Sequence, residues 1–257
     1  MVGFKVAHGD RIFCYDFHGL NFSEVPGLNT SRERLPDASF YAALYAPAQH
    51  KADDRFIHSK HCTADLVIEM LGGHLSPGRL LSWGAGLGLI EQRLAEAGWD
   101  VDAVEVIRSD AWPKQVAWFA SLDGVPDRQY DAVITISTLY SQDDAACAKL
   151  FESFVERLRP GGLILLAEQD SRSILGTLRG YIARKLVHER RSDSQLWGFL
   201  RVPSFYLRQA KMQHIESRFF ALNGDWSFTR LKPPRRIFGR QLLFRRSRMY
   251  FHLLQKV

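Results

Sequence analysis

The sequence has few cysteines and no long run of apolar residues. Of the 257 residues only 3 are cysteine, and Cys14, Cys62 and Cys147 are scattered, which argues against a disulfide framework and fits a reducing cytoplasm. No apolar stretch approaches the roughly 20 residues that span a bilayer. Residues 1–17 alternate polar and apolar side chains instead of forming the apolar block of a secretory signal. We therefore expect a cytoplasmic protein without a transmembrane segment.

Internal repeats, low-complexity tracts and paired metal-ligand groups are also missing. His58, His61 and Cys62 cluster, but no second group of Cys and His stands at a suitable spacing, so we expect no metal site. The composition, with 46% hydrophobic and 24% charged residues, is that of an ordinary globular protein. The length suits one large domain and would make a second independent domain cramped.

Acidic residues are scarce in the last third of the chain. Residues 171–257 hold 19 Lys and Arg against 4 Asp and Glu, whereas residues 1–170 hold 15 against 24. This asymmetry points to an anionic partner, which could be nucleic acid, a phosphorylated or carboxylated substrate, or an anionic lipid surface. The alternative is that the arginines solvate helix faces or pair with the acidic part of the chain.

A glycine-rich turn follows a short apolar strand at residues 79–83. Gly84, Gly86 and Gly88 can adopt conformations closed to other residues, and without Cβ atoms they let main-chain N–H groups approach a ligand. Glu105 stands 21 residues after Gly84, within the apolar run 101–106. An acid about 20 residues beyond such a turn typically binds ribose hydroxyls. The pairing predicts a nucleoside-binding cleft.

Apolar runs and amphipathic segments alternate through the middle of the chain. We expect strands at 79–83, 101–106, 115–119, 130–137 and 163–168, helices at 87–97 and 143–158, and then a helix at 204–212 and strands at 214–222 and 248–256. Before them we expect a hairpin in residues 4–17 and helices near 40–45 and 61–71, and after residue 170 a basic helix at 173–187. This order predicts a parallel sheet covered on both faces, with ligands beyond the carboxyl ends of its strands.

We divide the chain into an N-terminal part, residues 1–60, with the hairpin and lead-in helices, and a core, residues 61–257. Two insertions of this core, at about 171–203 and 223–247, are expected on the substrate side.

The order of parts from about residue 79 to residue 256 resembles the class I S-adenosylmethionine-dependent methyltransferases. Three features carry the resemblance: the glycine turn with Glu105, the run Tyr-Asp-Ala-Val-Ile at 130–134, and the run Leu-Arg-Pro-Gly-Gly-Leu at 158–163. It implies an α/β, Rossmann-like, doubly wound and mostly parallel seven-stranded sheet, with an antiparallel last strand from residues 249–256, helices on both faces, and S-adenosylmethionine as cofactor. In one departure, Ser82 stands where the family usually has Asp or Glu, beside the bulky Trp83.

The resemblance also implies a set of cofactor-binding residues. The glycines would wrap the methionine and ribose portions, Glu105 would bind the ribose diol, residues 121–123 would flank the adenine, and residues 137–140 would face the reacting methyl. The full set is Ser82, Gly84, Ala85, Gly86, Gly88, Glu105, Val106, Leu122, Asp123 and Ser137.

Methyl transfer from a sulfonium is an in-line displacement, so the protein mainly aligns the reactants and excludes water. A neutral hydroxyl acceptor also needs a base. The candidates we place first are Tyr140, Asp143 and His61. Further candidates are Glu168, Asp170, His50 and His58. Each has a structural alternative, since Asp143 could cap its helix, Glu168 could pair with an arginine, and histidines are more often packed or solvated than catalytic.

Signatures of nucleic-acid methyltransferases are missing. Amino-group enzymes of that kind carry Asn or Asp, then Pro-Pro and an aromatic residue after strand four, where this chain has Ser-Thr-Leu-Tyr at 137–140, and the cytosine C5 enzymes need a cysteine there. We therefore expect an acceptor pocket built from arginines and aromatic residues of about 179–206 and 226–246. The aromatic residues are Trp197, Phe199, Phe205, Tyr206, Trp226 and Phe228.

Our hypothesis is O-methylation of an anionic or glycosylated small molecule, such as a saccharide precursor or a secondary metabolite. An RNA-directed methyltransferase using the basic third of the chain, and a non-catalytic binding protein with a decayed cofactor site at Ser82, remain open. So do a nicotinamide-binding fold, which would want its third glycine at Leu89, and a glycine turn that only packs a helix on a strand. The oligomeric state is left open.

Overall fold

The computed structural model describes residues 54–139, 142–169, 203–222, 228–231 and 248–257, together with three short strands near the N-terminus. These are β1 (Val6–His8), β2 (Arg11–Tyr15) and β3 (Asn21–Phe22). β1 and β2 pair antiparallel, as the hairpin expected in residues 4–17 requires, and β3 adds to β2. The helices expected near 40–45 and at 173–187 lie outside the described residues.

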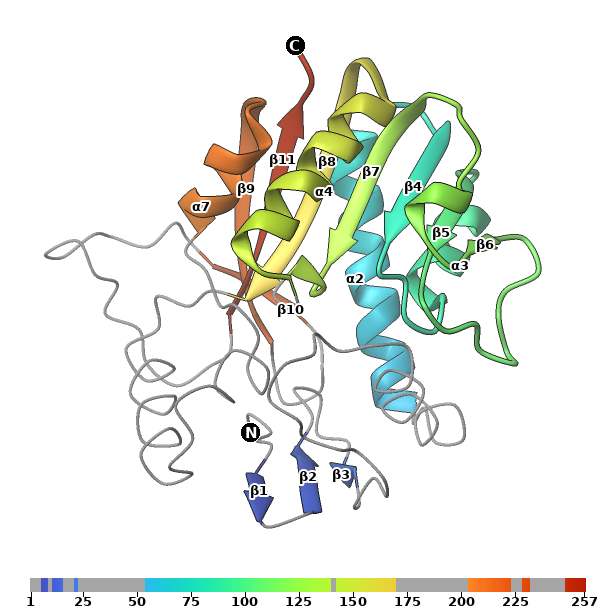
Figure 1. Cartoon of the computed structure of the whole chain (residues 1–257), viewed down its shortest axis with the longest axis vertical. Coiled ribbons are helices and arrows are strands. Elements are labelled where there is room, and N and C mark those ends of the chain that lie inside the picture. The colour runs from blue at the N-terminus through green and yellow to red at the C-terminus, as the bar shows by residue number, and fades with distance from the viewer. Residues whose placement is uncertain are drawn as a thin grey trace, which may run out of the picture.

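Eight strands form the main sheet (Figure 1), in the order β10-β9-β11-β8-β7-β4-β5-β6. Their bounds are β4 (Arg79–Trp83), β5 (Asp100–Val104), β6 (Ala117–Phe119), β7 (Tyr130–Ile136), β8 (Leu158–Gln169), β9 (Gln213–Leu222), β10 (Phe228–Leu231) and β11 (Arg248–Gln255). The five strands from β4 to β8 are parallel. β11 lies antiparallel between β8 and β9, which confirms the expected seven-stranded sheet with its antiparallel last strand. β10 extends that sheet by one edge strand inside the segment expected as an insertion.

Helices cover both faces of the sheet (Figure 1). One core packs beneath α2 (Asp54–Gly72) and α3 (Leu89–Glu96). The other packs beneath α4 (Asp144–Arg157) and α7 (Pro203–Ala210). Successive residues of a strand face opposite sides of a sheet, so Leu80 of β4 enters the first core and Leu81 the second. Burial on both faces explains why successive residues of the central strands are apolar, as Leu80 and Leu81 are.

Several elements begin or end away from their expected positions. α3 starts at Leu89 and not at residue 87, because Gly88 takes the left-handed conformation, with φ of 76°. β8 starts five residues early, at Leu158, because the Pro-Gly-Gly run expected as a turn is part of the strand, where Gly161 has φ of 75°. β6 is only three residues long, because the N–H of Val116 bonds to the carbonyl of Pro113 in a turn.

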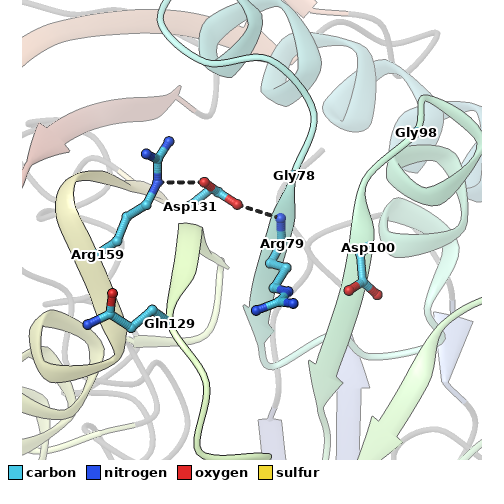
Figure 2. Close-up of a pocket in the computed structure, with 7 residues that line it drawn as sticks. All are labelled: Gly78, Arg79, Gly98, Asp100, Gln129, Asp131 and Arg159. Atoms are coloured by element: carbon cyan, nitrogen blue, oxygen red, sulfur yellow. Dashed lines mark hydrogen bonds and ion pairs between the residues drawn. The ribbon is translucent and has the colours of Figure 1, made fainter.

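A hollow of about 550 Å³ lies at the amino-terminal edge of the sheet, where β4, β5 and β7 begin. Asp131, one of its lining residues, lies between Arg159 and Arg79 (Figure 2). Its carboxylate pairs with Arg159, at 2.5 Å from Nε, and accepts the main-chain N–H of Arg79 at 2.7 Å. A Cβ on Gly78 would collide with this carboxylate. The residues of this hollow thus clamp neighbouring strands together, at the edge opposite to the glycine turn.

Candidate functional site

The glycine turn joins the carboxyl end of β4 to the start of α3. Gly84, Gly86 and Gly88 all have left-handed backbones, with φ of 79°, 60° and 76°. These conformations are unfavourable for residues with a Cβ, so the three glycines are needed to make the turn. The N–H of Gly84 bonds to the carbonyl of Val104 at 2.9 Å, which holds the turn over the end of β5.

The missing Cβ atoms of two of these glycines make room for the protein itself. A Cβ on Gly84 would collide with the side chain of Thr138 in the loop after β7, and a Cβ on Gly88 would lie 2.9 Å from Cδ of Pro113. At Gly84 and Gly88 the space that a Cβ would fill is therefore occupied by the protein itself. At these positions glycine lets the loops after β5 and β7 approach the turn.

Glu105 follows β5 and points toward the turn. Its Oε2 accepts the main-chain N–H of Gly86 at 2.6 Å and its Oε1 accepts that of Val106 at 2.9 Å. The side chain is 6% exposed, and burial raises its pKa above the ordinary value although these N–H groups lower it. The turn and the acid, 21 residues apart in the sequence, thus form one site with a partly desolvated carboxylate.

Val106 follows Glu105 directly, and the residues expected around an adenine, 121–123, come shortly after β6. Val106 is 42% exposed, an unusually open position for a large apolar side chain in the described part of the protein. The N–H of Glu105 bonds to the carbonyl of Phe119 at 3.0 Å, which brings the end of β6 next to the acid. The short 3-10 helix Leu122–Gly124 follows, in which Asp123 is exposed and Leu122 packs against the core under α4.

Ser82 faces a carboxylate that sequence reasoning missed. Its hydroxyl donates to Oε1 of Glu91 at 2.6 Å, and both side chains are buried. Glu91 lies in the first turn of α3, between the core residues Ile90 and Leu94. An acid on the side of a helix that also carries core residues is the signal that could have revealed it. Trp83 packs against Phe154 on the other face of the sheet, so it does not block the space beside Glu105.

The loop after β7 is held against the glycine turn by a second buried acid. Oε1 of Glu168 accepts the N–H groups of Thr138 at 2.9 Å and Leu139 at 2.7 Å. Ser137 has a left-handed backbone, with φ of 54°, which is uncommon outside glycine and concentrates at functional turns. Glu168, one of the candidate bases, therefore positions the loop that was expected to face the reacting methyl.

Of the other candidate bases, the structure describes Asp143, His61 and His58. Asp143 is the N-cap of α4, where its carboxylate accepts the N–H of Ala146 at 2.7 Å. His61 is half-buried on α2, and no hydrogen bond joins it to the turn within the described segments. On the same helix, Nε2 of His58 lies 3.5 Å from Sγ of Cys62. Candidates outside the described residues are Tyr140, Asp170 and His50.

Tyr206, one of the aromatic residues expected in the acceptor pocket, belongs to the core instead. It is 1% exposed and packs on Phe151 and Tyr250, and the half-buried Phe205 packs edge-on against it. Tyr206 was misassigned because the apolar face of α7 covers the sheet. Trp197, Phe199 and Trp226 lie outside the described residues.

The described segments hold neither a metal-ligand cluster nor a membrane-spanning helix. No group of three or more His, Cys, Asp or Glu side chains there could hold a metal ion. Among the helices of those segments, none has the length and apolarity needed to cross a bilayer.

The family model described as a methyltransferase domain matches residues 54–221. No curated protein sequence matches the chain. Three similar solved structures are a methyltransferase from Archaeoglobus fulgidus (14% identity, 77% of this chain and 94% of that one, TM-score 0.54), a possible histamine N-methyltransferase from Thermotoga maritima (15%, 86% and 100%, 0.53) and the magnesium protoporphyrin IX methyltransferase of Synechocystis (14%, 77% and 84%, 0.52).

At such low identities these likenesses show the fold, and they agree with the strand order of the main sheet. The family match covers well over half of the chain, from the start of α2 into β9. The chain belongs to the methyltransferase domain family and is a class I S-adenosylmethionine-dependent methyltransferase.

Proposed function

We propose that the glycine turn and Glu105 hold S-adenosylmethionine, with the carboxylate binding the two ribose hydroxyls. Support comes from Glu105, whose carboxylate lies against the turn and accepts the N–H groups of Gly86 and Val106; each oxygen of a carboxylate has two lone pairs, which leaves room for hydroxyl donors. Val106 offers an apolar surface for the adenine, and Ser82, Ala85, Leu122, Asp123 and Ser137 complete the site. When bound, the cofactor supplies an electrophilic methyl group, and the task of the chain is to orient the acceptor and exclude water.

For the acceptor, we propose an anionic or glycosylated small molecule that is methylated on oxygen. The observation that carries this proposal is the excess of basic residues after position 170. β8 and β9 both end at the sheet edge that holds the glycine turn, and β11 starts there, since Met249 pairs with Gln169 and Arg248 with Ala221. The described strand ends that flank the basic segments, Gln169, Leu222 and Arg248, thus lie at the sheet edge that holds the glycine turn.

A methyl-transfer assay with labelled S-adenosylmethionine tests this proposal. The acceptor panel should contain carboxylated and phosphorylated sugars, phenolic glycosides, and neutral and amine analogues of matched size. We expect transfer to hydroxyl groups of the anionic or glycosylated members. Transfer confined to amines, or to neutral aglycones, would contradict it.

The same basic excess supports a second candidate, an RNA-directed methyltransferase. Binding through phosphate contacts weakens steeply as salt rises. RNA retention that falls by orders of magnitude between 50 and 200 mM salt, together with methylation of the RNA, would favour this candidate. Absent or salt-insensitive retention would dismiss it.

A further inference from the structure

Glu91 ties the two ends of the glycine turn together. Its Oε1 accepts the hydroxyl of Ser82 at 2.6 Å, and Ser82 precedes the turn by two residues while Glu91 follows Gly88 by three. The carboxylate therefore stands beside the turn, on the α3 side of the sheet. The carboxylate comes from the first turn of α3, and at this place β4 supplies only the hydroxyl of Ser82.

Within the described residues, the second oxygen of the Glu91 carboxylate is buried and accepts no hydrogen bond. Glu91 is 2% exposed, and its Oε2 has no hydrogen-bond partner in the described part of the chain. Burial raises the pKa of Glu91 from its ordinary 4.5 to about 7, against the lowering effect of the Ser82 hydroxyl and its own main-chain N–H. Asp102, another buried acid, differs: one of its oxygens accepts hydrogen bonds from both Arg128 and Tyr130.

The charged groups that act on Glu91 are Lys60 from α2, which favours its ionised form, and Glu105, which opposes it. Lys60 also lies over the ring of Phe56, 5.1 Å from the centroid. Glu105 itself accepts the N–H of Gly86, so two buried carboxylates flank the same turn. Adding a positive charge at the turn would favour the ionised form of Glu91.

We propose that Glu91 is a cation-responsive part of the cofactor site and gives up its proton when S-adenosylmethionine binds, because the sulfonium and ammonium groups of this cofactor outweigh its one carboxylate and leave it with a net positive charge. In this step the O–H bond of the carboxylic acid breaks, the proton passes to solvent, and no bond of the cofactor changes. The inference rests on the proposed role of the glycine turn in cofactor binding and is independent of the acceptor.

Isothermal titration calorimetry with S-adenosylmethionine, repeated in buffers of different ionisation enthalpy, measures the number of protons released. At pH 7 about half of the Glu91 side chains are protonated before binding, so we expect release of roughly half a proton per cofactor. If the bound state is fully ionised, affinity should rise roughly eightfold between pH 6 and pH 7.5. S-adenosylhomocysteine, which lacks the sulfonium charge, should release fewer protons.

Glu91→Gln keeps the acceptor for Ser82 and removes the titrating group, so the difference between wild type and this variant isolates Glu91 from any titration of the cofactor. We expect the variant to lose the proton release and the eightfold pH dependence. Ser82→Ala retains the carboxylate and should retain the release. Equal proton release in wild type and Glu91→Gln would overturn the inference while leaving cofactor binding intact. Failure of wild type to bind either ligand would overturn both the inference and the cofactor role of the turn.

Discussion

Glu91→Gln should stabilise the ligand-free protein at high pH and have little effect at low pH. The folded state holds the Glu91 proton with a pKa of about 7, whereas the ordinary value is 4.5. Below pH 4.5 both the folded and the unfolded state are protonated, so the raised pKa has no cost. As pH rises from 4.5 to 7 the unfolded state ionises first, and stability is lost through this window. Above pH 7 the accumulated cost is about 3 kcal/mol.

The neutral amide resembles the protonated acid, so the variant avoids this cost. At pH 8 its free energy of unfolding should exceed that of wild type by up to about 3 kcal/mol, or roughly 6–12 °C in Tm for a domain of this size. Urea titrations of both proteins at pH 5, 6, 7 and 8 measure the difference. Glu152→Gln, at an exposed position of α4, is the matched control and should change stability little at every pH. A difference between wild type and Glu91→Gln that is the same at pH 5 and pH 8 would refute the reasoning.

Two further substitutions test the glycine turn and the N-cap of α4. Gly84→Ala should destabilise the protein by at least about 2 kcal/mol in urea unfolding, because it places a Cβ in a left-handed backbone and against Thr138. Gly72→Ala is the control, since there is open space around its Cβ. Equal destabilisation by the two substitutions would contradict this explanation. Asp143→Ala should cost about 1 kcal/mol through loss of the α4 cap. Asp143→Asn should keep most of that stability, and if it nevertheless abolished methyl transfer, Asp143 would be a base and more than a cap.

Much of the core was predictable because local patterns and the fold agree there. The strand at residues 79–83 was predicted with its observed bounds, since an apolar run bounded by Gly78 and Gly84 leaves little freedom. A strand at residues 248–256 was also predicted from its local pattern, and β11 pairs with β8 along nearly its whole length. Its antiparallel orientation was implied by the resemblance to the methyltransferases and not by the local pattern.

The less predictable features depend on contacts between distant segments. The Ser82–Glu91 hydrogen bond, the packing of Thr138 on Gly84, and the hold of Glu168 on the loop after β7 all require the folded sheet to bring separate loops together. Pro-Gly-Gly at residues 160–162 is a turn signal, and in β8 it forms an irregular stretch between Leu158, which pairs with Tyr130, and Leu163, which pairs with Ala132. Tyr206 is aromatic next to a basic segment, but the apolar face of α7 places it in the core.

The most direct test of the cofactor site is the affinity of S-adenosylhomocysteine for wild type and for Glu105→Ala, measured by calorimetry at pH 7.5. Each hydrogen bond from a ribose hydroxyl to the carboxylate is worth about 1.5–3 kcal/mol, so the variant should bind at least tenfold more weakly. Glu96→Gln, on the exposed side of α3, should bind like wild type. Unchanged affinity in Glu105→Ala would contradict the assignment of this carboxylate and the glycine turn as the cofactor site.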